Sequence, residues 1–326
     1  MRDLRTIITR IKILCPSISQ GSNPKSLEFE SVFPEGLPRR LSGLDRGSKY
    51  LLAAVKELLC EAGIGNRQRA GAAVATFLGS NSSRIKFLRG VLQDGKRIAD
   101  PIAFKTTVPS VAVGALAILY QCCGPTLTCV GVGEAGLAAL HNACMLIQRG
   151  VVDEMIVGGY EDLPAELLKI VPQRLKGKIP WVEGGAALLV KNEAACMAKD
   201  EDILARIRGF GLSGQGTTLV HKKNALREAM KMAICHAGEK TVNAIISAGV
   251  PYMVMEQEMF PGLPVIDTTA VWGEALGMSG IIRLVTAVEA LNNSEQKPYI
   301  QSPNRNILVN GVGIPGTAYT VLLSKY

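Results

Sequence analysis

The chain has 326 residues, of which 48% are hydrophobic and 20% charged, so it can form a large core and lacks the composition of a disordered protein. Its net charge of +8 would suit an acidic partner, but no basic run with interleaved aromatic residues occurs, so we expect no nucleic-acid partner. No uninterrupted apolar run reaches about 18 residues and no signal-peptide pattern opens the chain, so we expect no membrane partner.

In the first half, apolar periodicity and glycine or proline stops predict alternating strands and helices. We expect a strand over 5–15, a helix over 48–63, a strand over 70–80, a helix over 108–125, a strand over 126–132, a helix over 133–150 and strands over 153–162 and 185–193.

The second half repeats this order. We expect a strand over 205–214, a helix over 222–238, strands over 242–249 and 264–269, a helix over 273–293 and closing strands over 306–313 and 317–325. Alternating strands and helices indicate an α/β protein with mainly parallel pairing. We therefore predict two similar halves, residues 1–170 and 171–326, packed as one compact unit.

The eight cysteines form no CxxC pair and lie mostly in apolar stretches, which is typical of reduced, buried thiols in a cytoplasmic protein. With only three histidines, a metal site is not expected. The sequence also contains no pattern that calls for a cofactor.

Five stretches in chain order carry a family resemblance. They are "DPIAFKTTVPSVAVGALAILYQCCGP" (100–125), "MIVGGYED" (155–162), "VEGGAALLVKNE" (182–193), "WGEALGMSGIIRLVTAVEAL" (272–291) and "NGVGIPGTAYTVLL" (310–323). Together they resemble the β-ketoacyl synthase branch of the thiolase superfamily. The resemblance implies the thiolase fold, a pseudo-duplicated layered α/β/α/β/α structure with two mixed, mainly parallel sheets.

The resemblance also locates the positions of the family's catalytic residues. Condensing ketosynthases use a cysteine at a strand-to-helix turn, two histidines and a lysine. Here Gly133 stands at the cysteine position, Ala248 and Glu274 at the two histidine positions and Thr269 at the lysine position. The catalytic set is therefore expected not to be intact.

Chain-length factors, the ketosynthase β subunits, show such losses, and "SAGVP" (247–251) is similar to their usual text. The resemblance implies a non-catalytic subunit, inactive alone. It would pair with an active β-ketoacyl synthase and shape the acyl tunnel in polyketide, polyene or fatty-acid-type biosynthesis. Two alternatives stay open: a stand-alone decarboxylase or thioesterase-like enzyme using Glu134 or Glu274 as base, and a homodimeric acyl-binding scaffold.

Individual residues carry further expectations. Glu134 and Glu274 could cap helices or form a polar site. An acyl carrier protein could be bound through the partner subunit, or it could dock on a basic helix face of this chain. That face consists of Lys222, Lys223, Arg227 and Lys231. If no carrier protein docks there, the face is simply solvated. The strand over 126–132 would face the partner subunit. Tunnel, interface or core positions are Phe104, Val108, Val111, Cys129, Val132, Met155, Val312 and Ile314.

Overall fold

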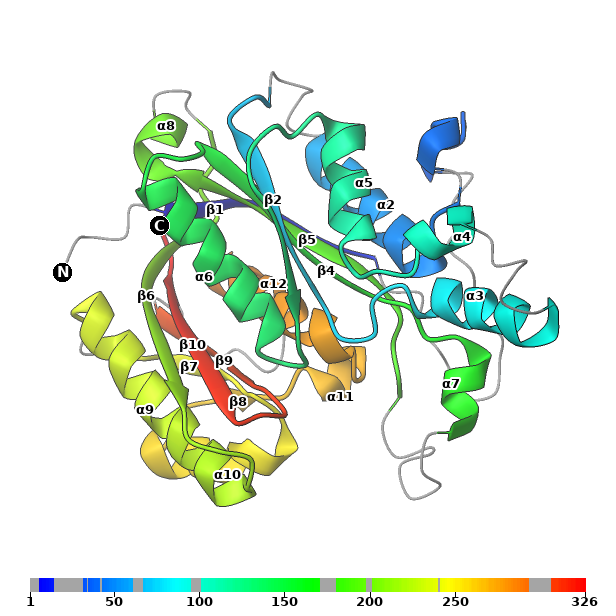
Figure 1. The fold of residues 1–326 in the computed structure, drawn as a ribbon. Helices are drawn as coiled ribbons and strands as arrows, with labels where there is room; N and C mark the ends of the chain where they lie inside the picture. Colours follow the sequence, from blue (N-terminus) through cyan, green and yellow to red (C-terminus); the bar gives the residue numbers. More distant parts are fainter. Residues whose placement is uncertain are drawn as a thin grey trace.

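A computed structural model describes residues 6–14, 32–33, 35–41, 43–60, 67–94, 101–170, 180–197, 201–239, 241–292 and 306–326. Its first part, drawn from blue to green in Figure 1, alternates strands and helices. The elements are β1 (Thr6–Leu14), η1 (Arg39–Leu41), α2 (Arg46–Cys60), β2 (Ala70–Thr76), α3 (Asn81–Asp94), α4 (Pro101–Lys105), α5 (Val111–Tyr120), β3 (Thr126–Val130), α6 (Ala135–Gln148), β4 (Glu154–Glu161), α7 (Ala165–Ile170), β5 (Gly184–Asn192) and α8 (Glu193–Met197).

The second part repeats the pattern. It contains β6 (Ala205–Gly214), α9 (Leu219–Ala237), β7 (Ala244–Ile246), α10 (Val250–Met259), β8 (Val265–Ile266), α11 (Thr269–Trp272), η4 (Leu276–Met278), α12 (Ser279–Asn292), β9 (Asn306–Val312) and β10 (Thr317–Ser324). The predicted strands and helices are therefore confirmed as elements, with shifts at their ends. Surface helix α3, in which no side chain over 81–93 is buried, was not predicted.

The strands form one ten-stranded sheet in the order β3-β2-β4-β5-β1-β6-β10-β9-β7-β8. Strands β1 and β6 pair over Thr6–Ile8 and Ala205–Ile207, which joins the strands of the two halves. The expected mixed sheets are confirmed, and the β1–β6 pairing joins the two of them edge to edge. Five strand pairings are antiparallel and four are parallel.

The two groups of five strands have the same internal order, since β3-β2-β4-β5-β1 matches β8-β7-β9-β10-β6 position by position. Strand β5 pairs with β4 and β1, so it completes the first group although it follows residue 170. The repeated order agrees with a duplicated unit, whereas the division of the chain at residue 170 stays a prediction.

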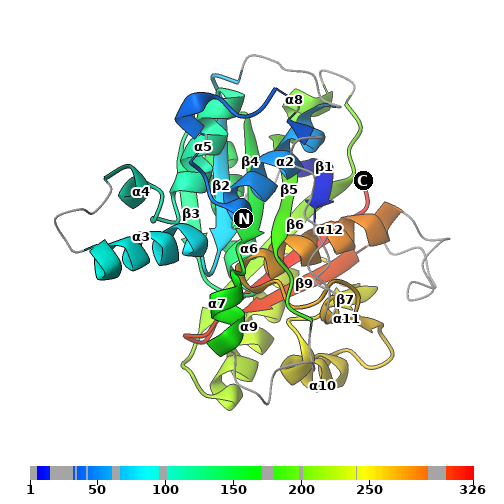
Figure 2. The ribbon, with the colours of Figure 1, turned by 90° about the vertical axis from the view of Figure 1, so that its right-hand side faces the viewer.

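The helices build three layers around this sheet (Figures 1 and 2). Apolar side chains of α2 and α5 pack on the first strand group, and those of α9 and α10 pack on the second. Between the groups, α6 and α12 share one core with strands of both, through residues such as Leu140 and Leu284. The predicted α/β/α/β/α layering is confirmed, with the sheet running continuously through both strand layers.

Two glycines let α6 and α12 touch backbone to backbone. A Cβ at Gly136 would lie 2.5 Å from the backbone nitrogen of Ile281, and a Cβ at Gly280 would lie 2.9 Å from the carbonyl oxygen of Gly133. Real Cβ atoms are not found so close to other backbones, so larger residues would push the helices apart. The contact brings the beginning of α12 directly against the turn that precedes α6.

No helix in the described parts of the chain is both long and apolar enough to cross a membrane.

Candidate functional site

The turn between β3 and α6 carries the first candidate residues. Gly131 donates its N–H to the carbonyl oxygen of Thr76 (3.1 Å), which ties the turn to neighbouring β2. Glu134 follows as the first residue before α6, but its side chain makes no capping hydrogen bond. The carboxylate fills space left by glycines instead, because a Cβ at Gly131 or Gly313 would lie 2.6 or 2.1 Å from its Oε1.

Glu134 is thereby enclosed, with only 8% of its surface exposed. Burial raises the pKa of its carboxyl group, and the positive charge of Arg283 opposes that rise. Its Oε2 has no hydrogen-bond partner among the described residues. The side chain is a buried acid beside a buried cation rather than a helix cap.

Arg283, on α12, occupies the place where a side chain at position 133 would project. Its Nη1 donates to the carbonyl oxygen of Gly133 (3.4 Å), and a Cβ at Gly133 would lie only 2.5 Å from the same nitrogen. Arg283 is 4% exposed, so its guanidinium group has little free space to move into. A residue larger than glycine at 133 would require the guanidinium group to move.

The guanidinium group also reaches the strand ends of the second group. It donates to the carbonyl oxygens of Ala248 (3.1 Å) and Asn310 (3.4 Å). Burial lowers the pKa of Arg283, and the nearby carboxylates of Glu274, Glu256, Asp267 and Glu134 oppose this by favouring the charged form. A buried cation surrounded by acids is the electrostatic centre of the site.

Glu256, on α10, is the most enclosed of these acids, with 0% exposure. Its carboxylate accepts hydrogen bonds from the Ser247 hydroxyl (2.5 Å), the Ala248 N–H (3.1 Å) and the Asn310 side-chain amide (2.9 Å). Burial raises its pKa, while these bonds and Arg283 favour the ionised form. The network fixes the backbone at Ala248, which offers only a methyl group to the site.

Thr269 and Glu274 stabilise their own loops. Thr269 donates its N–H to Asp267 (3.0 Å), and the Glu274 carboxylate accepts from the Leu276 N–H (2.8 Å) and the Ser279 hydroxyl (3.0 Å). Glu274 does not open a helix as expected. Positive φ angles at Gly273 (83°) and Leu276 (49°) interrupt the helix predicted from 273, so α12 begins only at Ser279.

The structure therefore brings the four positions that the resemblance indicates, Gly133, Ala248, Thr269 and Glu274, around Arg283. Gly133 and Ala248 accept hydrogen bonds from Arg283 through their carbonyl oxygens. The negative charges of Glu274 and Asp267 favour the charged form of Arg283. Thr269 is linked to this group because its N–H donates to Asp267. Sequence reasoning missed Arg283, Glu256 and Asn310. The available signal for Arg283 was a single charge inside the apolar run "GIIRLVTAV".

The predicted tunnel and interface residues are dispersed. Phe104, Val108 and Ile314 are exposed, Met155 and Val312 are buried in two different core clusters, and Val111, Val132 and Cys129 are half-buried. Burial raises the pKa of the Cys129 thiol, which disfavours the nucleophilic thiolate. Among the described residues, no group of three or more histidine, cysteine, aspartate or glutamate side chains forms a metal site.

The predicted basic face lies on the outer side of α9. Ala225, Leu226 and Ala229 pack inward. Lys231 is exposed and pairs with Glu228 of the same helix (2.9 Å), while Lys222, Lys223 and Arg227 are half-buried.

Comparison with known proteins places these features in context. Residues 14–169 match the family described as "Beta-ketoacyl synthase, N-terminal domain". The chain is 23% identical to a 3-oxoacyl-[acyl-carrier-protein] synthase 2 of Coxiella burnetii, covering 80% of this chain and 76% of that protein. It is 22% identical to the protein of the same name in Staphylococcus aureus (strain COL), covering 90% and 80%.

Solved structures agree on the fold. A β-ketoacyl synthase of Burkholderia phymatum aligns with a TM-score of 0.81 at 17% identity, over 99% of both chains. The ishigamide ketosynthase/chain length factor aligns with a TM-score of 0.79 at 18% identity, over 98% of this chain and 99% of that one. A chain of AntDE:AntF, a type II polyketide acyl-carrier protein in complex with its ketosynthase, aligns with a TM-score of 0.78 at 17% identity over all of both chains.

Proposed function

We propose that this chain, which is similar in sequence and fold to β-ketoacyl synthases, is a non-catalytic subunit of the chain-length-factor type. The observation that carries the proposal is the environment of Gly133. At the nucleophile position there is no side chain, and the Arg283 guanidinium group fills the adjoining space. A thioester exchange needs a nucleophile at this turn, and neither Gly133 nor Ala248 has a side chain that could attack or donate a proton.

The stand-alone enzyme has less support. A general base needs a carboxylate that is available to the substrate. The Glu274 carboxylate is bonded to the Leu276 N–H and the Ser279 hydroxyl, and Glu134 is enclosed by Gly131 and Gly313. Both acids balance the charge of Arg283, so their arrangement favours a structural role.

The proposed partner is an active β-ketoacyl synthase, paired along β3. This strand ends the sheet, so its outer backbone groups have no partner strand in the described chain, and Val130 is 62% exposed. Unpaired apolar edges are commonly covered by another chain. Helices α3 and α4 extend on the same side of the molecule (Figure 2), where Phe104 adds exposed apolar surface. The ketosynthase/chain length factor that shares this fold gives a precedent for such a pair.

An acyl carrier protein is the second proposed partner. The acyl-carrier protein complex among the structural neighbours motivates this, and the basic face of α9, Lys222, Lys223, Arg227 and Lys231, supplies positive charge for an acidic surface. We place the assembly in the cytoplasm, which keeps thiols reduced, because no disulfide joins the seven cysteines of the described parts.

The test is co-expression with an active ketosynthase of the same organism, followed by affinity capture and a condensation assay with malonyl-loaded carrier protein. We expect capture of a stable pair, activity in the pair and none in this chain alone. Val130→Lys should abolish capture, because a charge would be buried at the β3 edge. The matched control is Val254→Lys on α10, where the native side chain is 60% exposed; it should pair normally. Turnover by the isolated chain, or equal capture of both variants, would refute the proposal.

A further inference from the structure

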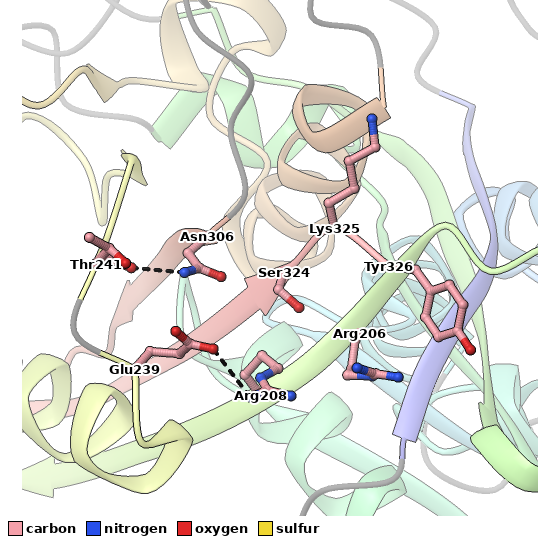
Figure 3. A pocket seen from close by; sticks show the side chains of 8 residues that line it. All are labelled: Arg206, Arg208, Glu239, Thr241, Asn306, Ser324, Lys325 and Tyr326. Atoms are coloured by element: carbon pink, nitrogen blue, oxygen red, sulfur yellow. Dashed lines mark hydrogen bonds and ion pairs between the residues drawn. The ribbon is translucent and has the colours of Figure 1, made fainter.

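A cavity of about 580 Å³ lies at the far end of the second strand group, away from the site around Arg283 (Figure 3). Asn306, at the beginning of β9, lines it, whereas Gly311 near the end of the same strand packs against Gly133. Strand β9 has 7 residues. At about 3.3 Å per residue its two ends lie about 20 Å apart. The cavity is therefore separate from the site described above.

Two arginines of β6 form one wall of the cavity. The burial pattern of β6 alternates, so Ala205 and Ile207 face the core while Arg206 and Arg208 share the opposite face. Figure 3 shows Arg208 joined to Glu239 and Arg206 beside Tyr326. Two guanidinium groups on one strand face present many N–H donors to the same space.

Each arginine is held in place by a carboxylate that contacts its Nη2 atom. Arg208 pairs with Glu239 (3.1 Å), which follows α9, and Arg206 pairs with Glu193 at the start of α8. The Cζ atom of Arg206 also lies 4.8 Å from the centre of the Tyr326 ring. Its Nε is buried and has no hydrogen-bond partner among the described residues.

A third cation completes the charge of the cavity. Lys325 lines it from the end of β10 and is exposed, and no ion pair among the described residues involves it. Of the described side chains that line the cavity, three are positive, Arg206, Arg208 and Lys325, and one, Glu239, is negative. Arginine forks and a lysine ammonium group are the side chains that proteins use to bind phosphate oxygens.

We propose that this cavity binds a small phosphate-bearing anion through Arg206, Arg208 and Lys325. The volume matches that of ordinary small-molecule sites, which is ample for a phosphate ester with an organic portion. Asn306, whose side-chain amide is fixed by the carbonyl oxygen of Thr241 (2.9 Å), and the Tyr326 ring would contact that organic portion. The site is independent of the proposed pairing with a ketosynthase.

The test uses inorganic phosphate as the probe. Its binding is measured by the broadening of the phosphorus NMR line and by the thermal unfolding midpoint of the protein at constant ionic strength. We expect saturable binding and a higher midpoint in phosphate than in chloride. Succinate, which carries a similar charge but no phosphate group, should bind about tenfold more weakly. Arg208→Gln and Lys325→Gln should each weaken phosphate binding about fivefold or more.

The matched control is Lys86→Gln, which removes the same charge from an exposed position on α3. It should leave phosphate binding unchanged. Absence of saturable binding, succinate binding as tight as phosphate, or equal weakening by Lys86→Gln would overturn the proposal. Circular dichroism of the cavity variants separates a lost site from a lost fold.

Discussion

The Arg283 guanidinium group joins Gly133, Ala248 and Asn310 through hydrogen bonds, so replacing Arg283 with Met is the most informative perturbation of this site. Methionine keeps an unbranched side chain but removes the charge and all donors. The change deletes the hydrogen bonds to the carbonyl oxygens of Gly133, Ala248 and Asn310. It also leaves the buried carboxylates around it without their shared cation.

The expected cost follows from these losses. Two of the deleted hydrogen bonds are 3.4 Å long and one is 3.1 Å, so together they contribute about 2 kcal/mol. Leaving buried charge without its partner typically costs about 3–5 kcal/mol in total, and the apolar contacts of methionine offset part of it. We expect Arg283→Met to lower the free energy of unfolding by about 3 kcal/mol near pH 8.

Urea unfolding followed by circular dichroism measures this loss. With a slope of about 3 kcal/mol per molar urea, the midpoint should fall by about 1 M. The matched control is Arg227→Met on α9, which removes a half-buried arginine bonded to Asn224. It should cost less than about 0.5 kcal/mol.

The pH dependence gives a second, independent readout. Burial raises the pKa of Glu134 and of Glu256 in the native protein, and loss of the Arg283 charge would raise both pKa values further. An acid with a raised pKa in the folded state stabilises that state below its unfolded pKa and loses this contribution as pH rises through the folded pKa. The Arg283→Met deficit should therefore shrink between about pH 8 and pH 5. A deficit no larger than that of Arg227→Met, or one unchanged on acidification, would refute the reasoning.

Two further predictions concern folding. Burial raises the pKa of Glu161 to about 8, so its contribution to stability should decline as pH rises from about 4.5 to about 8. Glu161→Gln should remove that slope in urea midpoints while exposed Glu228→Gln keeps it, and an unchanged slope in Glu161→Gln would contradict the assignment. Gly280→Ala should cost about 1–3 kcal/mol because its Cβ would lie 2.9 Å from Gly136 Cα, whereas Gly90→Ala on α3, with nothing within 4 Å, should stabilise by about 0.5 kcal/mol. Equal thermal midpoints for the two alanine variants would show that α6 and α12 are not in tight contact.

Local elements were accessible from the sequence because short-range signals define them. Helix α9 ends at Gly238, which adopts the left-handed conformation (φ 65°) that favours glycine, and the buried strand β4 reads as a short apolar run with glycines. The joining of the strand groups by β1 and β6 was not accessible, because three residue pairs separated by about two hundred residues carry no local signal. The late start of α12 likewise depends on the φ angle of Leu276, a non-glycine residue that no turn rule marks.

The residues around Arg283 likewise fall into those that the sequence indicates and those that only the structure shows. The resemblance indicates Gly133, Ala248 and Glu274 because each lies at a fixed offset within a recognisable stretch, and their assignment to catalytic positions stays a prediction. The interpretation of Glu134 as a helix cap considered only its own helix, whereas glycines at 131 and 313 decide where the carboxylate lies. Arg283 could not be assigned because its environment is made by residues from four separate elements: the α6 turn, β7, α10 and β9.

Positions 133 and 283 are physically coupled. A side chain at 133 would begin 2.5 Å from Nη1 of Arg283, and the backbone contact at Gly136 and Gly280 holds the beginning of α12 directly against this turn. If the guanidinium group moved away, the buried carboxylates of Glu256 and Glu134 would lose the positive charge that compensates them. A reactive side chain at this turn is therefore incompatible with the charge network in its present form. The absence of a side chain at Gly133 and the buried arginine are two aspects of one packing arrangement, since each is tolerated only because of the other.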